Sequence, residues 1–245
     1  MPDYDAFFNG NWIPYSEVSI SPSDRGFSVG DLVFEVERTF NGVPFMLTEH
    51  LDRLYRSLKY VRMDALMTAS EMAELVVEGV SRASYSLENV GEFSLRQVVT
   101  RGAVDLFDNP APTVLLNTGE QSFWYAGLYD VGMAGGISKT RAYSPQSLDP
   151  KVKHYSRMNF VLAHQEVHDM EPGAWPILLD DRGNIAEGNG QNVFIVTDGV
   201  IRTPSDYAGL QGVSRGVTIT VANQLGIPLV EEDLQPYDLY TADEA

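Results

Sequence analysis

Two Asn-Gly pairs near the start of the chain constrain its fold more than any other feature. Asn9-Gly10 and Asn41-Gly42 each separate two stretches rich in aromatic and β-branched residues. An Asn-Gly pair readily supplies the positive φ angles of a two-residue hairpin turn. The sequence therefore predicts two antiparallel hairpins in its first part.

Helices and further strands follow these hairpins. The stretch TEHLDRLYRSLKYV (48–61) repeats leucine at helical spacing, and Thr68 with Glu71 forms a capping-box pattern before a second amphipathic helix. FSLRQVVTRG (93–102) and PTVLLNTG (112–119) are rich in β-forming residues. The first half is thus predicted to be an α+β domain.

The pattern changes at FWYAGLYD (123–130), where we predict the connection between two domains. Beyond it, helices are predicted over 155–170 and 214–225. The predicted strands are GGISKTRAYS (135–144), WPILLDD (175–181), NVFIVTDGVIRTP (192–204) and IPLVEEDL (227–234). Short strands separated by turns are typical of barrel-like domains. We therefore expect an α+β domain over 1–123 and a barrel-like domain over 131–245.

The composition argues against several classes of function. Seventeen basic residues against thirty-four acidic ones give a net charge of −17, which repels nucleic acid and anionic membranes. The absence of cysteine removes disulfides and thiolate zinc sites. The N-terminus lacks a basic segment followed by an apolar one, and no apolar run is long enough to span a bilayer. We expect a cytoplasmic protein with neither a nucleic-acid nor a membrane partner.

Lysine is scarce in this chain. Its four lysines are Lys59, Lys139, Lys151 and Lys153. A lysine amine becomes nucleophilic where burial or a nearby cation lowers its pKa. Lys59 falls on an amphipathic helix and is expected to be solvated, and Lys139 falls in a strand without special neighbours.

Lys153 has the most suggestive surroundings of the four. It precedes a predicted helix expected to turn Met158, Val161 and Leu162 toward the core, and Arg157 is close in sequence. Lys153 could therefore point into a partly dry pocket that also holds a cation. The spacing alone favours the alternative, a surface lysine at a helix start.

Two histidines four residues apart raise the question of a metal. His164 and His168 have the spacing of two zinc ligands on one helix face. The metalloprotease pattern requires Glu directly after the first His, and Gln165 stands there. We predict ordinary helix-surface histidines and no metal.

Two glycine-rich turns are candidate parts of a binding site. Glu187 precedes a Gly-Asn-Gly turn that lets backbone approach a flat or bulky group, although this acid could equally stabilise the turn. Gly212 and Ser214 stand at a helix start, where free N–H groups and the helix dipole form an anion site. The alternative is simple N-capping by Ser214.

Five motifs together carry a family resemblance. SDRGFSVGDLVFE, EHLDRL, KHYSRMNFVLA, AEGNGQNVFIV and GLQGVSRGVTITVANQLGIPLVEEDL occur in order along nearly the whole chain. Their order and spacing resemble the class IV, fold type IV aminotransferases, which use pyridoxal 5'-phosphate and include branched-chain, D-amino acid and (R)-amine transaminases. The resemblance implies a small α/β sandwich N-terminal domain, a larger pseudo-barrel C-terminal domain, that cofactor and a homodimer.

The resemblance also implies roles for individual residues. Lys153 matches the lysine that forms the imine with the cofactor and moves the substrate Cα proton. Arg53 matches the arginine that binds the cofactor phosphate, together with N–H groups of Val213 and Ser214 and a hydroxyl. Glu187 matches the carboxylate that keeps the pyridine nitrogen protonated.

The chain departs from the branched-chain pattern at two positions. Arg157 and Met158 stand where an Asn-Tyr pair is common, so Arg157 is the candidate for the contact with the cofactor's phenolic oxygen. Arg96, Arg38 and Arg101 are candidates for binding the substrate carboxylate, and Arg96 is favoured. The alternative for these arginines is solvation or structural pairing.

These features predict transfer of an amino group from an amino acid or primary amine to a 2-oxo acid or ketone. The specificity is expected to be atypical and to include D-amino acids or (R)-amines. An aminodeoxychorismate lyase-type enzyme is the alternative that KHYSRM favours. A non-catalytic remnant is another, because family chains continue into a Thr-Gly-Thr-Ala turn where this sequence ends at Ala245. On that comparison we expect a truncated C-terminal end.

Overall fold

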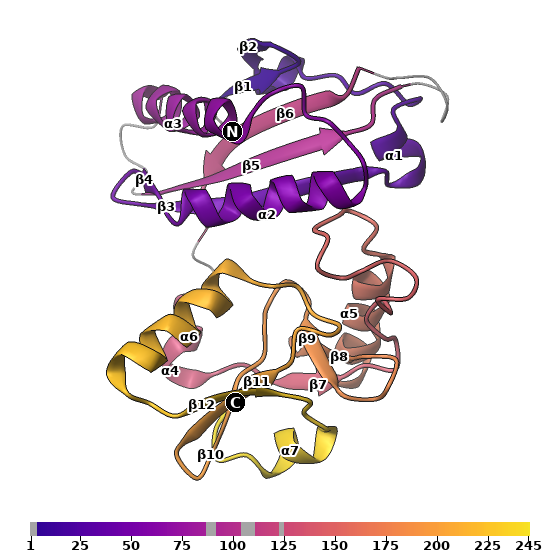
Figure 1. Ribbon diagram of the computed structural model, residues 1–245, viewed down its shortest axis with the longest axis vertical. Helices are drawn as coiled ribbons and strands as arrows, with labels where there is room; N and C mark the ends of the chain where they lie inside the picture. The colour runs from indigo at the N-terminus through magenta and orange to yellow at the C-terminus, as the bar shows by residue number, and fades with distance from the viewer. Residues whose placement is uncertain (1–3, 87–91, 104–110, 123–124) are drawn as a thin grey trace. The chain divides into compact units, whose positions relative to one another are not determined.

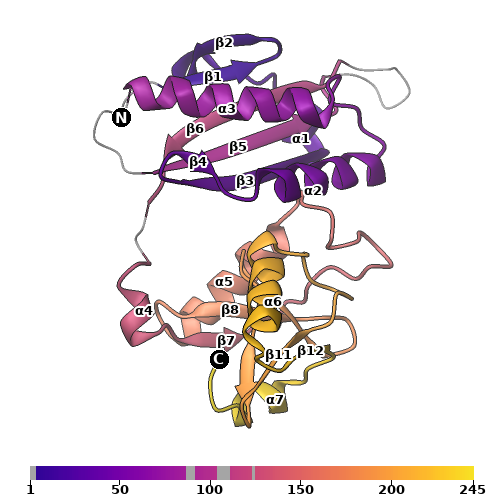
Figure 2. The ribbon, with the colours of Figure 1, turned by 60° about the vertical axis from the view of Figure 1, so that its left-hand side comes forward.

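In a computed structural model, the chain divides into two compact units (Figures 1 and 2). Unit 1 comprises Met1–Phe123 and Lys153–Ser156, and unit 2 comprises Trp124–Val152 and Arg157–Ala245. The structure describes residues 4–86, 92–103, 111–122 and 125–245. The mixed α and β content predicted from sequence is confirmed. The start of the predicted connection, 123–124, lies outside the described residues, and the two domain ranges remain predictions.

Unit 1 is built on one sheet in which every strand pairing is antiparallel, in the order β2-β1-β6-β5-β3-β4. Its strands are β1 (Asp5–Phe8), β2 (Asn11–Pro14), β3 (Leu32–Phe40), β4 (Val43–Pro44), β5 (Phe93–Thr100) and β6 (Thr113–Glu120). Positive φ angles at Asn9, Gly10, Asn41 and Gly42 turn β1 into β2 and β3 into β4. Both predicted hairpins are confirmed.

The helices of unit 1 are η1 (Tyr15–Glu17), α1 (Arg25–Val29), α2 (Leu47–Tyr60) and α3 (Ala69–Ser86). The predicted capping box is confirmed: the Thr68 N–H donates to Glu71 at 2.7 Å, and the Glu71 N–H donates to the Thr68 hydroxyl at 3.2 Å. Together α2 and α3 cover one face of the sheet (Figure 2).

The register of the sheet decides which side chains share a face. Glu35 lies opposite Gln97 and Gln97 opposite Leu116, on the face that α2 and α3 cover. Because side chains alternate along a strand, Phe34 and Arg96 point to the other face. We call this second surface the Phe34 face. Leu32, Phe34 and Val98 form a buried apolar cluster on it.

Unit 2 contains two three-stranded sheets, in the orders β7-β8-β9 and β10-β11-β12. The strands are β7 (Gly135–Ile137), β8 (Trp175–Leu179), β9 (Ile185–Gly188), β10 (Ile195–Thr197), β11 (Val200–Pro204) and β12 (Leu229–Glu232). The helices are α4 (Leu128–Val131), α5 (Met158–Met170), α6 (Val213–Leu225) and α7 (Pro236–Thr241). One cluster of core residues centres on Leu178 and Phe160, and another on Ile195 and Leu234.

Several predicted elements of unit 2 differ in extent from the observed ones. The predicted strand 192–204 is split into β10 and β11, because Asp198 and Gly199 both adopt positive φ and form a hairpin turn. The predicted strand 135–144 ends as β7 at Ile137. The predicted helix 155–170 begins only at Met158, since the preceding residues run beside β3 instead.

The prediction that Met158, Val161 and Leu162 face the core is also wrong. Met158, Val161 and Leu162 are 68%, 50% and 46% exposed. The buried residues of α5 are Phe160, Ala163 and Val167, which recur three and four apart and form the other apolar stripe of the helix. Within the described residues, no helix combines the length and apolar character needed to cross a membrane.

Candidate active site

Lys153 is attached to unit 1 through its main chain. The Phe34 N–H donates to the Lys153 carbonyl at 3.0 Å, and the Lys153 N–H donates to the Ser57 hydroxyl of α2 at 3.3 Å. An isolated bridge pairs His154 with Val33. The partly buried Lys153 side chain places Nζ 4.9 Å from the centroid of the Phe34 ring. The Lys153 backbone is thus held at the edge of the sheet by β3 and α2.

A buried charge cluster lies beside this edge. Arg53 donates to both carboxylate oxygens of Glu35, at 2.7 and 2.8 Å, and His50 Nδ1 lies 2.8 Å from Glu35. Burial alone would raise the pKa of Glu35, but the hydrogen bonds from Arg53 and His50, with the charge of Lys153, lower it below its usual value. Glu35 therefore stays ionised and electrostatically links Arg53 with Lys153.

The candidate substrate arginines have different surroundings. Arg96 and Arg38 lie on β5 and β3, on the Phe34 face, opposite Val36 and Ser94 respectively. Arg38 donates to the Thr39 carbonyl at 3.1 Å and stacks on the Phe40 ring.

Arg101 is held by structural contacts. It binds both oxygens of Asp31 at 2.7 and 3.1 Å, and it also donates to the carbonyls of Val61 and Arg62 at the end of α2. These contacts give the Arg101 guanidinium a structural role within unit 1.

Glu187 and Arg157 come together in unit 2. Glu187 is 5% exposed at the end of β9 and accepts a hydrogen bond from the Leu210 N–H at 3.0 Å. Burial lowers the pKa of Arg157, and the charges of Glu187 and Tyr143 only partly offset this. The guanidinium of Arg157 stacks on Phe160, 3.9 Å from the ring centroid.

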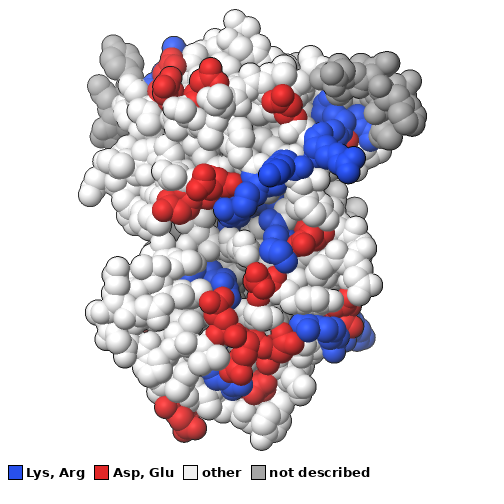
Figure 3. Space-filling model, viewed as in Figure 1, with Lys and Arg blue, Asp and Glu red and all other residues white. Residues whose placement is uncertain are grey.

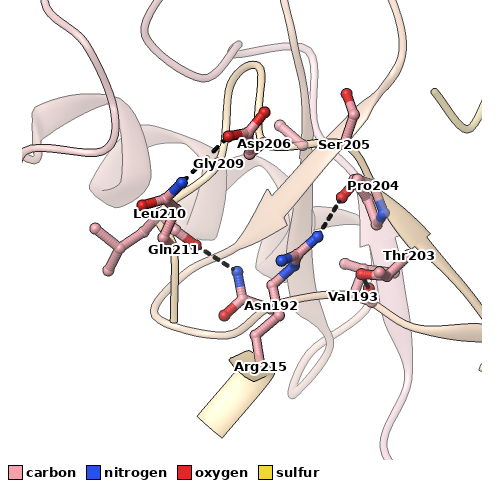
Figure 4. Close-up of a pocket in the computed structure, with 11 residues that line it drawn as sticks. Asn192, Val193, Thr203, Pro204, Ser205, Asp206, Gly209, Leu210, Gln211 and Arg215 are labelled. Atoms are coloured by element: carbon pink, nitrogen blue, oxygen red, sulfur yellow. Dashed lines mark hydrogen bonds between the residues drawn. The ribbon is translucent and has the colours of Figure 1, made fainter. Parts of the chain in front are cut away.

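The loop before α6 is held by Asn192, which follows β9 in the chain (Figure 4). Gly212 is the N-cap residue and Val213 begins the helix, so the alternative of N-capping by Ser214 is wrong. The Asn192 amide donates to the Leu210 carbonyl at 2.8 Å, and a Cβ at Gly212 would collide with the Asn192 side-chain oxygen. The absence of a side chain at Gly212 therefore lets Asn192 pack against this loop.

The remaining sequence candidates fall elsewhere. The rings of His164 and His168 stack with centroids 6.3 Å apart, and no cluster of metal-ligating residues occurs among the described residues. Lys59 is exposed on α2. The N–H of Lys139 donates to Glu166 at 2.9 Å, in the turn after β7.

The sequence analysis missed Glu35, His50 and Asn192. A signal for the first two was present, since acids within a strand of apolar residues must be paired to be buried, and His50 lies three residues before Arg53. Each unit thus holds its own group: Lys153, Arg53 and Glu35 in unit 1, and Glu187, Arg157 and the start of α6 in unit 2.

The comparisons with known proteins agree on one family. The family model "Amino-transferase class IV" matches residues 32–245. The "Putative branched-chain-amino-acid aminotransferase" of Methanocaldococcus jannaschii is 36% identical over 97% of this chain and 81% of the relative. A D-alanine aminotransferase of Staphylococcus aureus is 28% identical, covering 97% and 82%. The chain belongs to the class IV aminotransferases.

Solved structures agree with this assignment. The branched-chain aminotransferase of Thermoproteus uzoniensis with norvaline has a TM-score of 0.89 at 25% identity, covering 98% of this chain and 82% of that one. The T.th. branched-chain enzyme, complexed with N-(5'-phosphopyridoxyl)-L-glutamate, has a TM-score of 0.87 at 27% identity, covering 98% and 80%. The fold type IV expectation is confirmed.

The family depends on pyridoxal phosphate, and the residues of this chain fit that group chemically. Unit 1 offers a partly buried lysine amine beside an aromatic ring. Unit 2 offers the buried carboxylate of Glu187 and the N-terminus of α6. Gly212 precedes that helix at a place where a Cβ would collide with Asn192. An amine, an acid and an anion-binding helix end are the groups that the aldehyde, pyridine and phosphate of the cofactor require.

Proposed function

We propose that this chain uses pyridoxal phosphate to transfer an amino group from an amino acid or primary amine to a 2-oxo acid or ketone, with Lys153 as the catalytic residue. The observation that carries the proposal is the double anchoring of the Lys153 backbone, to Phe34 and to Ser57, with its amine over the Phe34 ring. A lysine fixed in this way can accept and return a proton at one position.

The family resemblance supplies the proposed roles of the other residues, and their chemistry suits those roles. Arg53 and the free N–H groups at Val213 and Ser214 bind the cofactor phosphate, because a guanidinium fork and a helix N-terminus both favour oxyanions. Glu187 accepts a hydrogen bond from the protonated pyridine nitrogen, and Arg157 donates to the phenolic oxygen. When bound, the cofactor supplies a ring that withdraws electrons from the substrate Cα.

Donor range is where we expect this chain to differ from branched-chain enzymes. Met158 is 68% exposed where a tyrosine is common, and Ser94 and Arg96 occupy the Phe34 face. The D-alanine aminotransferases among the relatives also favour a range of donors that includes D-amino acids. We propose that D-amino acids or (R)-amines react at rates comparable with, or above, those of branched-chain L-amino acids.

Three donors test this proposal. The holoenzyme is mixed separately with L-leucine, D-alanine and (R)-1-phenylethylamine, and the change in the visible absorption of the bound cofactor is followed. Rapid change with D-alanine or the amine supports the proposed range. Reaction with L-leucine alone defeats the donor proposal but leaves the aminotransferase assignment intact.

We further propose a homodimer, with small-molecule donor and acceptor as the other partners. The exposed apolar residues Met158, Val161 and Leu162 of α5 provide surface suited to a second copy. Light scattering coupled to gel filtration measures the mass directly. A fully active monomer contradicts the dimer.

A further inference from the structure

Glu37 of β3 is an acid buried without a basic partner. Acidic and basic side chains are spread over the face of the molecule drawn in Figure 3, where water stabilises their charges. Glu37 instead is 3% exposed. Its Oε1 accepts from the neutral amide of Gln97 at 2.6 Å, and its Oε2, which is also buried, has no hydrogen-bond partner in the part of the chain that the structure describes. An acid in such surroundings avoids the cost of a buried charge by keeping its proton.

The neighbouring acid on the same face has the opposite surroundings. Arg53 donates to both oxygens of Glu35, and His50 lies 2.8 Å from it, so Glu35 is ionised. Glu37 stands two positions further along β3, on the same face and about 7 Å away. Two carboxylates this close, beneath a layer of helices, do not both ionise readily. The charge of Glu35 therefore helps to hold the proton on Glu37.

Gln97 allows Glu37 both to hold a proton and to release it. A glutamine amide contains donors and an acceptor, so it can donate to a carboxylate or accept from a carboxylic acid. Burial raises the pKa of Glu37 to about 8 against the hydrogen bond from Gln97, and the charge of Glu35 raises it further. Glu37 thus changes its charge between neutral and mildly alkaline pH.

The charges that act on Glu37 come from its own strand and from α2. They are those of Glu35 and Arg53, and His50 and Lys153 act in turn on Glu35. Gln97 of β5 is neutral, and the side chains that α3 buries are apolar throughout the described part of that helix. While Glu37 is protonated, one carboxylate opposes the Arg53 guanidinium. Ionisation of Glu37 adds a second carboxylate.

We propose that Glu37 controls how strongly Arg53 binds phosphate: when protonated it leaves the guanidinium opposed by Glu35 alone, and when ionised it adds a negative charge that repels the phosphate. The proposal rests on the proposed function, in which Arg53 binds the cofactor phosphate. It makes retention of the cofactor depend on pH, with weaker binding above about pH 8. Reciprocity requires that bound phosphate also strengthens the hold of Glu37 on its proton.

The test compares pyridoxal phosphate with pyridoxal, which lacks the phosphate. Equilibrium dialysis gives the dissociation constants of both for the full chain, as wild type and as Glu37→Gln, which stays neutral at every pH. At about pH 6.5 the two proteins should bind pyridoxal phosphate equally, and at about pH 9.5 wild type should bind it about tenfold more weakly. Their affinities for pyridoxal should stay equal throughout. This comparison cancels the titration of Lys153 and of the ligands themselves.

Wild type alone provides a second measurement that does not depend on how the variant folds. The phosphate is already a dianion above about pH 7, so its own charge is constant there. The ratio of the affinities for pyridoxal phosphate and pyridoxal should nevertheless fall as Glu37 ionises. Glu49→Gln, at an exposed acid of α2, is the control and should follow the same pH course as wild type.

Calorimetry measures the reciprocal effect. Binding of pyridoxal phosphate near pH 8 should draw a proton onto Glu37. Titrations in two buffers with different enthalpies of ionisation should therefore show more proton uptake by wild type than by Glu37→Gln. Equal uptake by the two proteins contradicts the proposal.

The other outcomes are equally decisive. If wild type and Glu37→Gln bind pyridoxal phosphate equally at every pH, Glu37 does not act on the phosphate. An equal alkaline loss for pyridoxal also overturns the proposal, because it shows that ionisation disturbs the whole site. A wild-type protein that gains no cofactor absorption with pyridoxal phosphate refutes the proposed function instead.

Discussion

The two units hold their candidate site residues by different physical means. In unit 1, side-chain charges are buried together: Glu35, Arg53 and His50 are all under 9% exposed and bind one another. In unit 2, the contacts that orient the site involve backbone, since Glu187 accepts the Leu210 N–H and Asn192 donates to the Leu210 carbonyl. The buried cluster around Arg53 in unit 1 thus depends on charge, whereas the start of α6 in unit 2 depends on close backbone packing.

This difference determines which substitutions each unit tolerates. Removing one member of a buried ion pair leaves the other charge without compensation, which costs stability. Adding a methyl group where a backbone and a side chain are in contact displaces the loop. We expect this displacement to change the arrangement of the site residues more than the free energy of unfolding. The two units should therefore respond to substitution with different measurable losses.

The largest effect is expected at Lys153 of unit 1, the proposed catalytic residue. Lys153→Ala should leave a folded protein whose transamination falls by about 10⁴-fold, because the proton-transfer group is gone. Cofactor absorption characteristic of lysine attachment should be absent. The control is Lys59→Ala, at an exposed lysine of α2. Full-strength absorption in Lys153→Ala would remove Lys153 from the site.

Glu187 of unit 2 should give the next largest effect. Glu187→Gln keeps a hydrogen-bonding group beside Leu210 but removes the charge, so we expect cofactor retention and half-reactions about 100-fold slower. Stopped-flow absorption after addition of the donor measures the rate. Glu171→Gln, at the exposed end of α5, serves as the control. Unchanged rates in Glu187→Gln would exclude an electronic role for this carboxylate.

In unit 1, neutralising the buried acid should mainly lower stability. Glu35→Gln leaves the Arg53 charge buried without its carboxylate, and breaking such a pair costs about 3 kcal/mol of unfolding free energy. Urea denaturation compares it with Glu49→Gln, at an exposed position of α2. A loss equal to that of the control would show that Arg53 does not depend on Glu35.

In unit 2, a methyl group at the start of α6 should mainly lower cofactor affinity. Gly212 has φ −62° and ψ 137°, which alanine also adopts, so Gly212→Ala acts through its collision with Asn192 rather than through backbone strain. We expect about tenfold weaker pyridoxal phosphate binding, from misaligned N–H groups whose hydrogen bonds are worth about 1 kcal/mol each.

Gly216→Ala is the matched control for that substitution, because nothing lies within 4 Å of a Cβ built there. Equilibrium dialysis of the cofactor measures both variants. Equal affinities for Gly212→Ala and Gly216→Ala would show that α6 does not depend on the Asn192 contact.

Local features of the fold, such as turns and helix caps, were predictable from the sequence. The residues at which helices and strands begin and end were less predictable. The Asn-Gly hairpins and the Thr68–Glu71 capping box depend on neighbouring residues alone, and both were predicted. The start of α5 depends on the pairing of 153–156 with β3, more than a hundred residues away in the chain. No local pattern encodes such a contact.

The candidate site residues also divide into those predictable from local motifs and those that depend on distant contacts. Lys153, Arg53 and Glu187 were predicted as site residues because the motifs around them resemble those of a family. Glu35 and His50 meet only in the folded chain, and the contacts of Glu35 with His50 and Arg53 span fifteen or more positions of sequence. Their positions become meaningful only once sheet register places them on a particular face.

The last prediction concerns Glu37, the second acid on the helix-covered face of the unit 1 sheet. It is 3% exposed, and Gln97 donates to it at 2.6 Å. Burial raises the pKa of Glu37 to about 8, the charge of Glu35 adds to this, and the hydrogen bond from Gln97 with the charge of Arg53 only partly opposes it. The folded protein therefore keeps a proton on Glu37 over a pH range in which the unfolded chain has lost it.

That difference makes unfolding depend on pH. The contribution of Glu37 to stability is greatest below the pKa of this carboxyl in the unfolded chain, declines as pH rises from about 4.5 to about 8, and levels off beyond. The slope from one proton is at most about 1.4 kcal/mol per pH unit. Urea denaturation at several pH values in this window compares wild type with Glu37→Gln, so that other titrating groups cancel. If the difference between the two proteins stays constant across the window, Glu37 is ionised in the folded state and unit 1 holds a second buried charge.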